Sequence, residues 1–163
     1  GNGILLPNLL LDGANVFGIE PYVVKFKATQ KVLSKNNLNT KIKIFNESGE
    51  KTHFKKGFFD IIFANSVLEH VKHQDKLYIE VNRILKDSGL FLVLVPTENI
   101  LYDFSRFVLR IKKPHDHYYN SKEIKQILSQ YFSIVHESYY YRFAPFFHLF
   151  ICKKKNNVRG KKR

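Results

Sequence analysis

The sequence predicts an α/β fold: a doubly wound, mostly parallel sheet with helices on both faces and an antiparallel hairpin at its C-terminal end. Strand-like and helix-like segments alternate along the 163 residues, which is typical of parallel strands joined by helices. The stretch FFDIIFAN is a continuous apolar run, as expected for a parallel strand covered on both faces. The chain also opens on the glycine loop GNG, which leads into a short apolar segment. That order belongs to the first half of a nucleotide-binding α/β unit.

The first half of the chain alternates between helix and strand signals. In order, we expect a helix over residues 4–13 closed by Gly13, a strand over 15–20, a helix from Pro21 to about Lys35, and a strand over 41–45. Gly13 suits the end of the first helix, because glycine readily adopts the left-handed conformation found there. A loop should follow up to residue 57.

The second half continues this alternation and ends in two strands. In order, we expect a strand over residues 58–65, a helix from about Asp75 to Lys86, a strand over 90–96, helices over 100–111 and 120–130, and strands over 132–143 and 145–153. The residues Asp87, Ser88 and Gly89 should end the helix that precedes the strand over 90–96. Asn120 and Glu123 form a capping-box signal. The last two strands, joined by a tight turn at Ala144–Pro145, should pair antiparallel.

Composition places the chain among globular proteins and sets limits on its surroundings. Residues 1–152 are long enough for one domain with a core of its own. No apolar run approaches the roughly 20 residues that a membrane-spanning helix needs, and no signal peptide is visible. The single Cys152 excludes an internal disulfide and a cysteine metal cluster. We therefore expect a reducing, cytoplasmic setting.

Positive charge is concentrated at the end of the chain. The formal net charge is +13, and seven of the 27 basic residues lie within residues 153–163. Such a tail can bind nucleic acid or anionic lipid. A solvated, disordered end is the simpler interpretation of a run of like charges. We favour that interpretation, so nucleic acid stays a possible partner that is not the preferred one.

The opening loop fits poorly with two classes of phosphate-containing ligand. A phosphate-cradling loop of the P-loop kind needs a lysine and a serine or threonine after its last glycine, where this chain has Ile4 and Leu5. A dinucleotide-binding loop needs a third glycine at the position of Leu6, if Gly1 is the first.

S-adenosylmethionine is the third class, and the sequence suits it better. This cofactor has no phosphate; it needs a loop that lets the backbone approach its methionine part. It also needs an acid at the end of the second strand of such a unit, which here is the strand over 15–20. That acid accepts hydrogen bonds from both ribose hydroxyls. Gly1, Gly3 and Glu20 have these properties. The alternative for Glu20 is an ordinary solvent-facing acid at the end of a strand.

The stretch FFDIIFANSVLEHVKHQDKLYIEVNRILKDSGLFLVLVP resembles the middle of a class I S-adenosylmethionine-dependent methyltransferase, closest to the type-11 group that includes ubiquinone- and menaquinone-pathway enzymes. The elements that carry this resemblance, in the family's order, are Phe59–Asp60, Leu68–Glu69–His70, Arg83–Ile84–Leu85–Lys86, Gly89 and Leu90–Val95. It covers about residues 1–152 and is weakest from 100 to 130. It implies a Rossmann-like fold and methyl transfer to a small-molecule acceptor.

The resemblance also implies which residues bind S-adenosylmethionine. They are Gly1, Asn2 and Gly3 beside the methionine part, Glu20 and Pro21 at the ribose, Ser48, Gly49 and Glu50 at the adenine, and Asn65 and Ser66 along the methionine moiety. The family often has an aspartate where Ser48 stands, so the contact with the adenine amino group is the least secure of these.

Two histidines are candidates for a catalytic role. Methyl transfer is a direct displacement, and a base is needed only if the acceptor must lose a proton. His70 lies in the segment just after a strand, near where the methyl group should point, and His117 belongs to the polar cluster HDHY on a loop. Either could instead be structural, a histidine bonded to backbone or part of an ordinary loop. We expect no metal site, because only the spacing within that cluster resembles a ligand set.

Three further expectations concern the chain as a whole. In this fold the central strand would precede Gly1, so we expect the chain to lack its first strand and first glycine and to be unstable or inactive by itself. An RNA methyltransferase stays an alternative because of the charge, although the segment NSVLEH stands where an Asn-Pro-Pro-Tyr motif would be expected. A non-catalytic binding module of the same fold is the other alternative.

Overall fold

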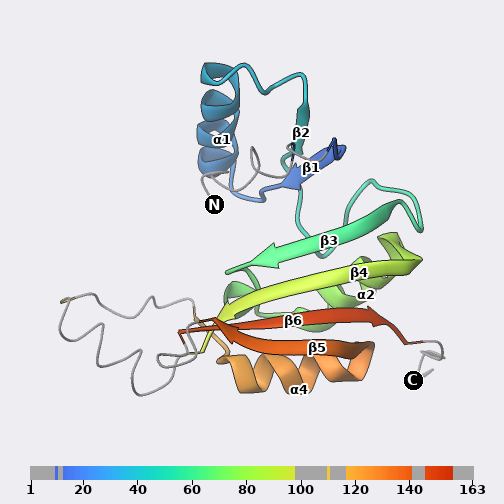
Figure 1. The fold of residues 1–163 in the computed structure, drawn as a ribbon. Helices are drawn as coiled ribbons and strands as arrows, with labels where there is room; N and C mark the ends of the chain where they lie inside the picture. The colour runs from blue at the N-terminus through green and yellow to red at the C-terminus, as the bar shows by residue number, and fades with distance from the viewer. Residues whose placement is uncertain (1–9, 11–12, 98–109, 111–116, 141–145, 156–163) are drawn as a thin grey trace. The chain divides into compact units, whose positions relative to one another are not determined.

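The computed structural model describes residues 10, 13–97, 110, 117–140 and 146–155 (Figure 1). The chain divides into two compact units, Gly1–Thr52 and His53–Arg163. The helix expected over 4–13 lies mostly outside the described residues, as do the helix over 100–111 and the turn at Ala144–Pro145. One domain over residues 1–152 stays a prediction.

The first unit contains β1 (Val16–Ile19), α1 (Val23–Lys35) and β2 (Ile42–Phe45), as predicted. The two strands pair in parallel, and Val16, Leu33 and Ile42 form a small core between them and the helix. Gly13 has a φ angle of +71°, the left-handed conformation expected of it, and its N–H donates to the carbonyl of Leu10.

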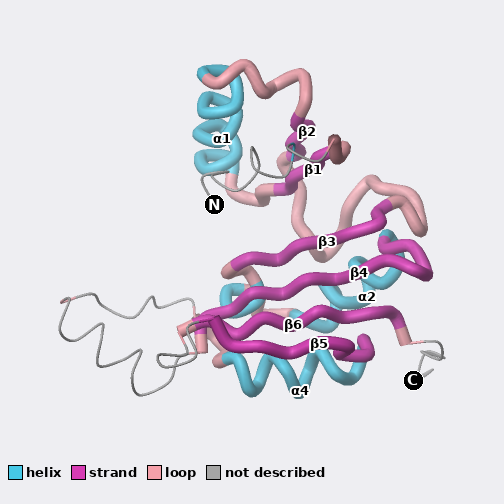
Figure 2. The backbone as a smooth tube through the Cα atoms, in the orientation of Figure 1, coloured by secondary structure: helices cyan, strands magenta, loops and turns pink. Residues whose placement is uncertain are grey.

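The sheet of the second unit has the order β3-β4-β6-β5 (Figures 1 and 2). Its strands are β3 (Phe59–Asn65), β4 (Leu85–Pro96), β5 (Phe132–Tyr140) and β6 (Phe147–Lys154). The β3–β4 pair is parallel, whereas β4–β6 and β5–β6 are antiparallel, which confirms the predicted C-terminal hairpin. The strand β6 runs to Lys154, so it includes the first two residues of the expected basic tail.

The described helices of this unit pack together with the sheet in one core. They are η2 (Leu68–His70), α2 (Gln74–Ile84) and α4 (Ser121–Tyr131), and none of the described helices is long and apolar enough to cross a membrane. Apolar side chains of α2 and α4 meet Phe91 and Val93 of β4 and Phe150 of β6. Cys152 is buried in the same cluster, and burial raises the pKa of its thiol to about 12. The thiolate is therefore scarce at neutral pH.

The face of this sheet opposite the core cluster carries partly exposed apolar side chains. The register places Ile61 and Phe63 opposite Leu90 and Leu92, on the face away from the core cluster. Ile61 is 58% exposed and Phe63 is 39% exposed. The helix expected over 100–111 lies outside the described residues, so the expected cover on both faces of FFDIIFAN stays a prediction.

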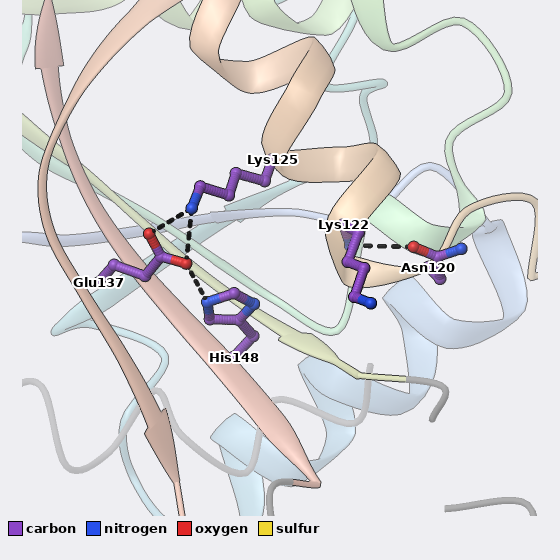
Figure 3. A network of polar contacts seen from close by, with 5 residues as sticks. All are labelled: Asn120, Lys122, Lys125, Glu137 and His148. Carbon is purple, nitrogen blue, oxygen red and sulfur yellow. Dashed lines mark hydrogen bonds and ion pairs between the residues drawn. The ribbon is translucent and has the colours of Figure 1, made fainter. Parts of the chain in front are cut away.

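The capping box at Asn120 is confirmed. Its side-chain oxygen accepts the N–H groups of Lys122 and Glu123 at 2.9 and 3.1 Å (the first is drawn in Figure 3). The Glu123 carboxylate in turn accepts the N–H of Asn120 at 2.8 Å. Such a cap contributes about 1 kcal/mol to helix stability, so the start of α4 is set by its own sequence.

The junction between α2 and β4 differs from the prediction. The helix ends at Ile84, and Leu85 already pairs with Phe59 of β3. Gly89 was expected to end the helix, but it lies in the strand, where a Cβ atom would come within 2.7 Å of the Leu85 side chain and 3.0 Å of the Asp60 carbonyl oxygen. A register shift between Phe59 and Ile61 accommodates the extra residues of β4. Gly89 is needed here because two stretches of chain approach closely.

A polar network joins α4 to the C-terminal hairpin (Figure 3). The carboxylate of Glu137 on β5 accepts hydrogen bonds from Lys125 of α4 at 2.9 Å and from the ring of His148 on β6 at 2.8 Å. The His148 ring stacks on Tyr139 with 4.0 Å between centroids, and the residue is 1% exposed. This network was not predicted, because its members are on three different elements.

Candidate functional site

In the first unit, the carboxyl ends of β1 and β2 are tied together by Asn46. The Asn46 side chain donates to the backbone carbonyls of Glu20 at 2.8 Å and Pro21 at 3.0 Å. The N–H of Glu20 also donates to the carbonyl of Phe45 at 3.0 Å. The position of Glu20 and Pro21 is therefore set by β2 as well as by β1. Asn46 was missed at the sequence level, although a polar residue directly after a strand was the available signal.

The Glu20 carboxylate lies at the turn that leads from β1 to α1. One carboxylate oxygen accepts the N–H of Tyr22 at 3.2 Å, in the turn that leads into α1. A carboxylate offers about four lone-pair directions and no donor. The two neighbouring hydroxyls of a ribose are donors that a carboxylate can accept. Glu20 therefore fits the ribose-binding role predicted for it.

The segment after β2 forms a small turn of its own. Lys51 donates its N–H to the carbonyl of Ser48 at 3.1 Å, and Glu50 donates its N–H to the hydroxyl of Ser48 at 3.2 Å. Ser48 is exposed, whereas Gly49 and Glu50 are half-buried. The Ser48 hydroxyl thus stabilises the turn, and its own proton remains available for a further bond.

In the second unit, the carboxyl end of β3 has a strained backbone. Ser66 has a φ angle of +50°, and its N–H donates to the carbonyl of Leu94 at 2.8 Å. The left-handed conformation costs a non-glycine residue about 1–2 kcal/mol. Such strain persists where the surrounding structure imposes it, and it is concentrated at functional sites. Asn65 directly precedes this turn and is half-buried.

The two candidate histidines are brought together, although they are distant in the sequence. The rings of His70 and His117 lie 4.6 Å apart between centroids, at 78° to each other. Two hydrogen bonds hold the segments in place: the N–H of Tyr118 donates to the carbonyl of Glu69 at 2.8 Å, and the Tyr119 hydroxyl donates to the carbonyl of Lys72 at 3.1 Å.

Glu69 completes this cluster and was not predicted as a site residue. Its side chain is 1% exposed, and one ligating atom each from Glu69, His70 and His117 lie within 4.8 Å of one another. Gln74 supports the turn, because it donates to the carbonyl of Leu68 at 2.9 Å and accepts from the hydroxyl of Tyr78 at 2.8 Å. The spacing of residues in the sequence could not have predicted this cluster, because Glu69 and His117 come from segments that are distant in the chain.

Other parts of the predicted site are not placed. Gly1, Asn2, Gly3, His115 and Asp116 lie outside the described residues. A hollow beside α1 and β2 is lined by Leu33, Ile42 and Phe45, among others, but by none of the predicted site residues.

Comparison with known proteins supplies the family. Residues 1–93, more than half of the chain, match the family described as methyltransferase domain. No curated protein sequence matches the chain.

Solved structures show the same fold at low sequence identity. A methyltransferase dependent on S-adenosylmethionine from Aquifex aeolicus has a TM-score of 0.78 at 15% identity, over 95% of this chain and 78% of that chain. The PH0226 protein from Pyrococcus horikoshii OT3 has a TM-score of 0.74 at 17% identity, over 92% and 76%. Geranyl diphosphate C-methyltransferase from Streptomyces coelicolor A3(2) has a TM-score of 0.68 at 11% identity, over 95% and 70%.

Proposed function

Since the chain belongs to the class I S-adenosylmethionine-dependent methyltransferases, we propose that it transfers a methyl group to a small-molecule acceptor. Its cofactor is S-adenosylmethionine, which supplies a methyl group bound to a positively charged sulfur. The observation that carries the proposal is Glu20, an acid at the carboxyl end of β1 whose backbone is held by Asn46. Ligands of open α/β sheets bind at this edge.

We assign the binding roles as follows. Glu20 accepts the ribose hydroxyls, and Pro21 shapes the turn after it. The turn formed by Ser48, Gly49 and Glu50 borders the adenine. Asn65 and Ser66 lie along the methionine moiety, together with Gly1, Asn2 and Gly3. The strained backbone of Ser66 supports this assignment. A chain can leave a strand without a positive φ angle, and such strain is concentrated at functional sites.

The chemical task of the chain is mainly one of alignment. The acceptor atom, the methyl carbon and the sulfur must lie in a line, with water excluded. Where the acceptor carries a proton, His70 or His117 serves as the base, since a neutral imidazole can accept one. Their mutual contact supports this role, because each ring restricts the orientation of the other.

A small-molecule acceptor has support from one comparison. The structure from Streptomyces coelicolor A3(2) contains geranyl diphosphate, a small molecule, together with S-adenosylhomocysteine. The net charge of +13 favours one competing acceptor, RNA. The two can be separated by ending the chain at Lys155, which leaves β6 and the ion pair of Lys154 with Asp87 intact. Salt-dependent RNA binding that is lost in this shortened chain would favour RNA.

Calorimetric titration of the whole chain with S-adenosylhomocysteine tests the proposal. Against the expectation from the sequence that the chain is unstable or inactive by itself, we propose one binding site and methylation of at least one member of a panel of small acceptors. Absence of binding would overturn the assignment of the site. Binding without turnover on any acceptor of the panel would instead support a non-catalytic binding module.

A further inference from the structure

We propose that Glu69, His70 and His117 bind a divalent transition metal ion of the zinc class. One oxygen and two ring nitrogens, one from each residue, lie within 4.8 Å of one another. Two histidines and one carboxylate form a ligand set that zinc and its neighbours in the first transition row accept readily. Magnesium and calcium prefer sites made of oxygen atoms alone, so the donor set favours the transition metals.

The backbone around the three residues is suited to holding a ligand set. Glu69 and His70 are consecutive residues of η2, and the turn is anchored from the side of α2 by the Gln74 side chain. His117 is brought to η2 by the hydrogen bond from the N–H of the next residue, Tyr118, to the carbonyl of Glu69. The same peptide segment that carries one ligand therefore fixes the distance to the other two.

The burial of Glu69 supports its role as an anionic metal ligand. Its side chain is 1% exposed, whereas His70 is exposed and His117 is half-buried. Removing a carboxylate from water is costly, and a nearby cation offsets that cost. A metal ion between these three groups would have a buried anionic ligand on one side and an exposed histidine on the other.

The geometry requires only a modest adjustment. Zinc binds nitrogen and oxygen at about 2.0–2.2 Å, which places neighbouring ligand atoms roughly 3–3.5 Å apart. The three ligand atoms already lie within 4.8 Å of one another, so small side-chain rotations would bring them to the separations that zinc requires. Three protein ligands leave a coordination position open to an oxygen atom from water or from an acceptor.

The position of the cluster connects it to the proposed function. The turn η2 follows the carboxyl end of β3 after only Ser66 and Val67. Any part of the metal ion in methyl transfer therefore rests on that proposed function, and an ion held by both histidines would replace either of them as the base. Metal binding itself does not rest on the proposed function.

Titration of the whole chain with cobalt(II), without cofactor or acceptor, tests the site. Cobalt(II) substitutes for zinc and absorbs visible light when bound to nitrogen ligands. We expect one bound ion per chain, displaced by zinc. His70→Ala and His117→Ala should each weaken cobalt binding at least tenfold, and Glu69→Gln should do the same if its thermal melt shows a folded protein.

His73→Ala is the matched control, because His73 is an exposed histidine near His70 that is not part of the cluster. It should bind cobalt as the unaltered chain does. The proposal is overturned if the unaltered chain binds no cobalt, if His70→Ala and His117→Ala bind it unchanged, or if His73→Ala loses it equally. A parallel titration with S-adenosylhomocysteine in the presence of a chelator reports on the cofactor site alone. If the chain binds cobalt but does not bind S-adenosylhomocysteine, the result would count against the proposed function and would not affect the proposed metal site.

Discussion

The Nε2 atom of His148 lies 2.8 Å from Oε1 of Glu137, within a sheet that otherwise buries apolar side chains (Figure 3). Burial lowers the pKa of His148, and the Glu137 carboxylate offsets this effect only in part. Burial raises the pKa of Glu137, but the hydrogen bonds and charges of Lys125 and His148 outweigh it and hold that pKa below its ordinary value. At neutral pH the imidazole is thus uncharged and donates to a charged carboxylate. Its Nδ1 atom has no hydrogen-bond partner within the described part of the chain, so a second proton there would be poorly accommodated.

This pair predicts loss of stability in acid. The folded protein binds a proton on His148 less readily than the unfolded chain does. The contribution of the uncharged His148 to stability is therefore complete above pH about 6.5, and it is lost as the pH falls from there through the lowered pKa of the folded state. Glu137 acts in the same direction at lower pH. His148→Gln keeps a side-chain donor but cannot ionise, and its melting temperature should fall less between pH 7 and 5. His136→Gln, an exposed histidine on β5, should behave as the unaltered chain. Parallel melting curves for His148→Gln and the unaltered chain would contradict this account.

Removing the acid at the end of β1 should weaken the cofactor complex. Glu20→Ala deletes a charged acceptor, and hydrogen bonds to charged groups are worth about 1–3 kcal/mol, or roughly 5- to 150-fold in affinity. Calorimetry with S-adenosylhomocysteine measures the change. Asp75→Ala serves as the control, because Asp75 is an exposed acid in the first turn of α2. Unchanged affinity in Glu20→Ala would count against the ribose role.

Asn46 should act through Glu20 and not on the cofactor directly. Asn46→Ala removes both hydrogen bonds to the Glu20–Pro21 turn, and we expect it to weaken S-adenosylhomocysteine binding by about 1 kcal/mol. Because the two residues act as a unit, the double variant with Glu20→Ala should lose less than the sum of the single changes. Fully additive losses would mean that Asn46 does not position Glu20.

A side chain at Gly89 should destabilise the second unit. The added Cβ of Gly89→Ala would lie 2.7 Å from the Leu85 side chain, and Leu85 is fully buried, so it has little room to move. We expect a loss of about 1–3 kcal/mol in the free energy of unfolding, typical of overpacking. Urea denaturation measures this, with Ser88→Ala at the neighbouring exposed position as the control. Equal stability of the two variants would show that the close approach relaxes at little cost.

Much of the fold could be predicted from local pattern. The alternation of strands and helices, the capping box at Asn120 and the antiparallel hairpin are all confirmed. The exception is the start of β4, where the helix signal extends to Lys86 but the chain turns into the sheet at Leu85. Tertiary pairing with Phe59 prevailed there over local propensity.

Some features of the candidate site could likewise be predicted from local sequence, whereas others depend on tertiary contacts. The family, the placement of Glu20 after a strand and the candidacy of each histidine could be predicted from the amino-acid order, because strand ends and motifs depend on residues close together in the chain. The folded structure was needed to show that His70, His117 and the buried Glu69 form one cluster, that Asn46 holds the Glu20 turn, and that Glu137 joins Lys125 to His148. Each of those contacts joins separate segments, so it depends on how the elements pack and on the path of the chain between them, which no local pattern contains.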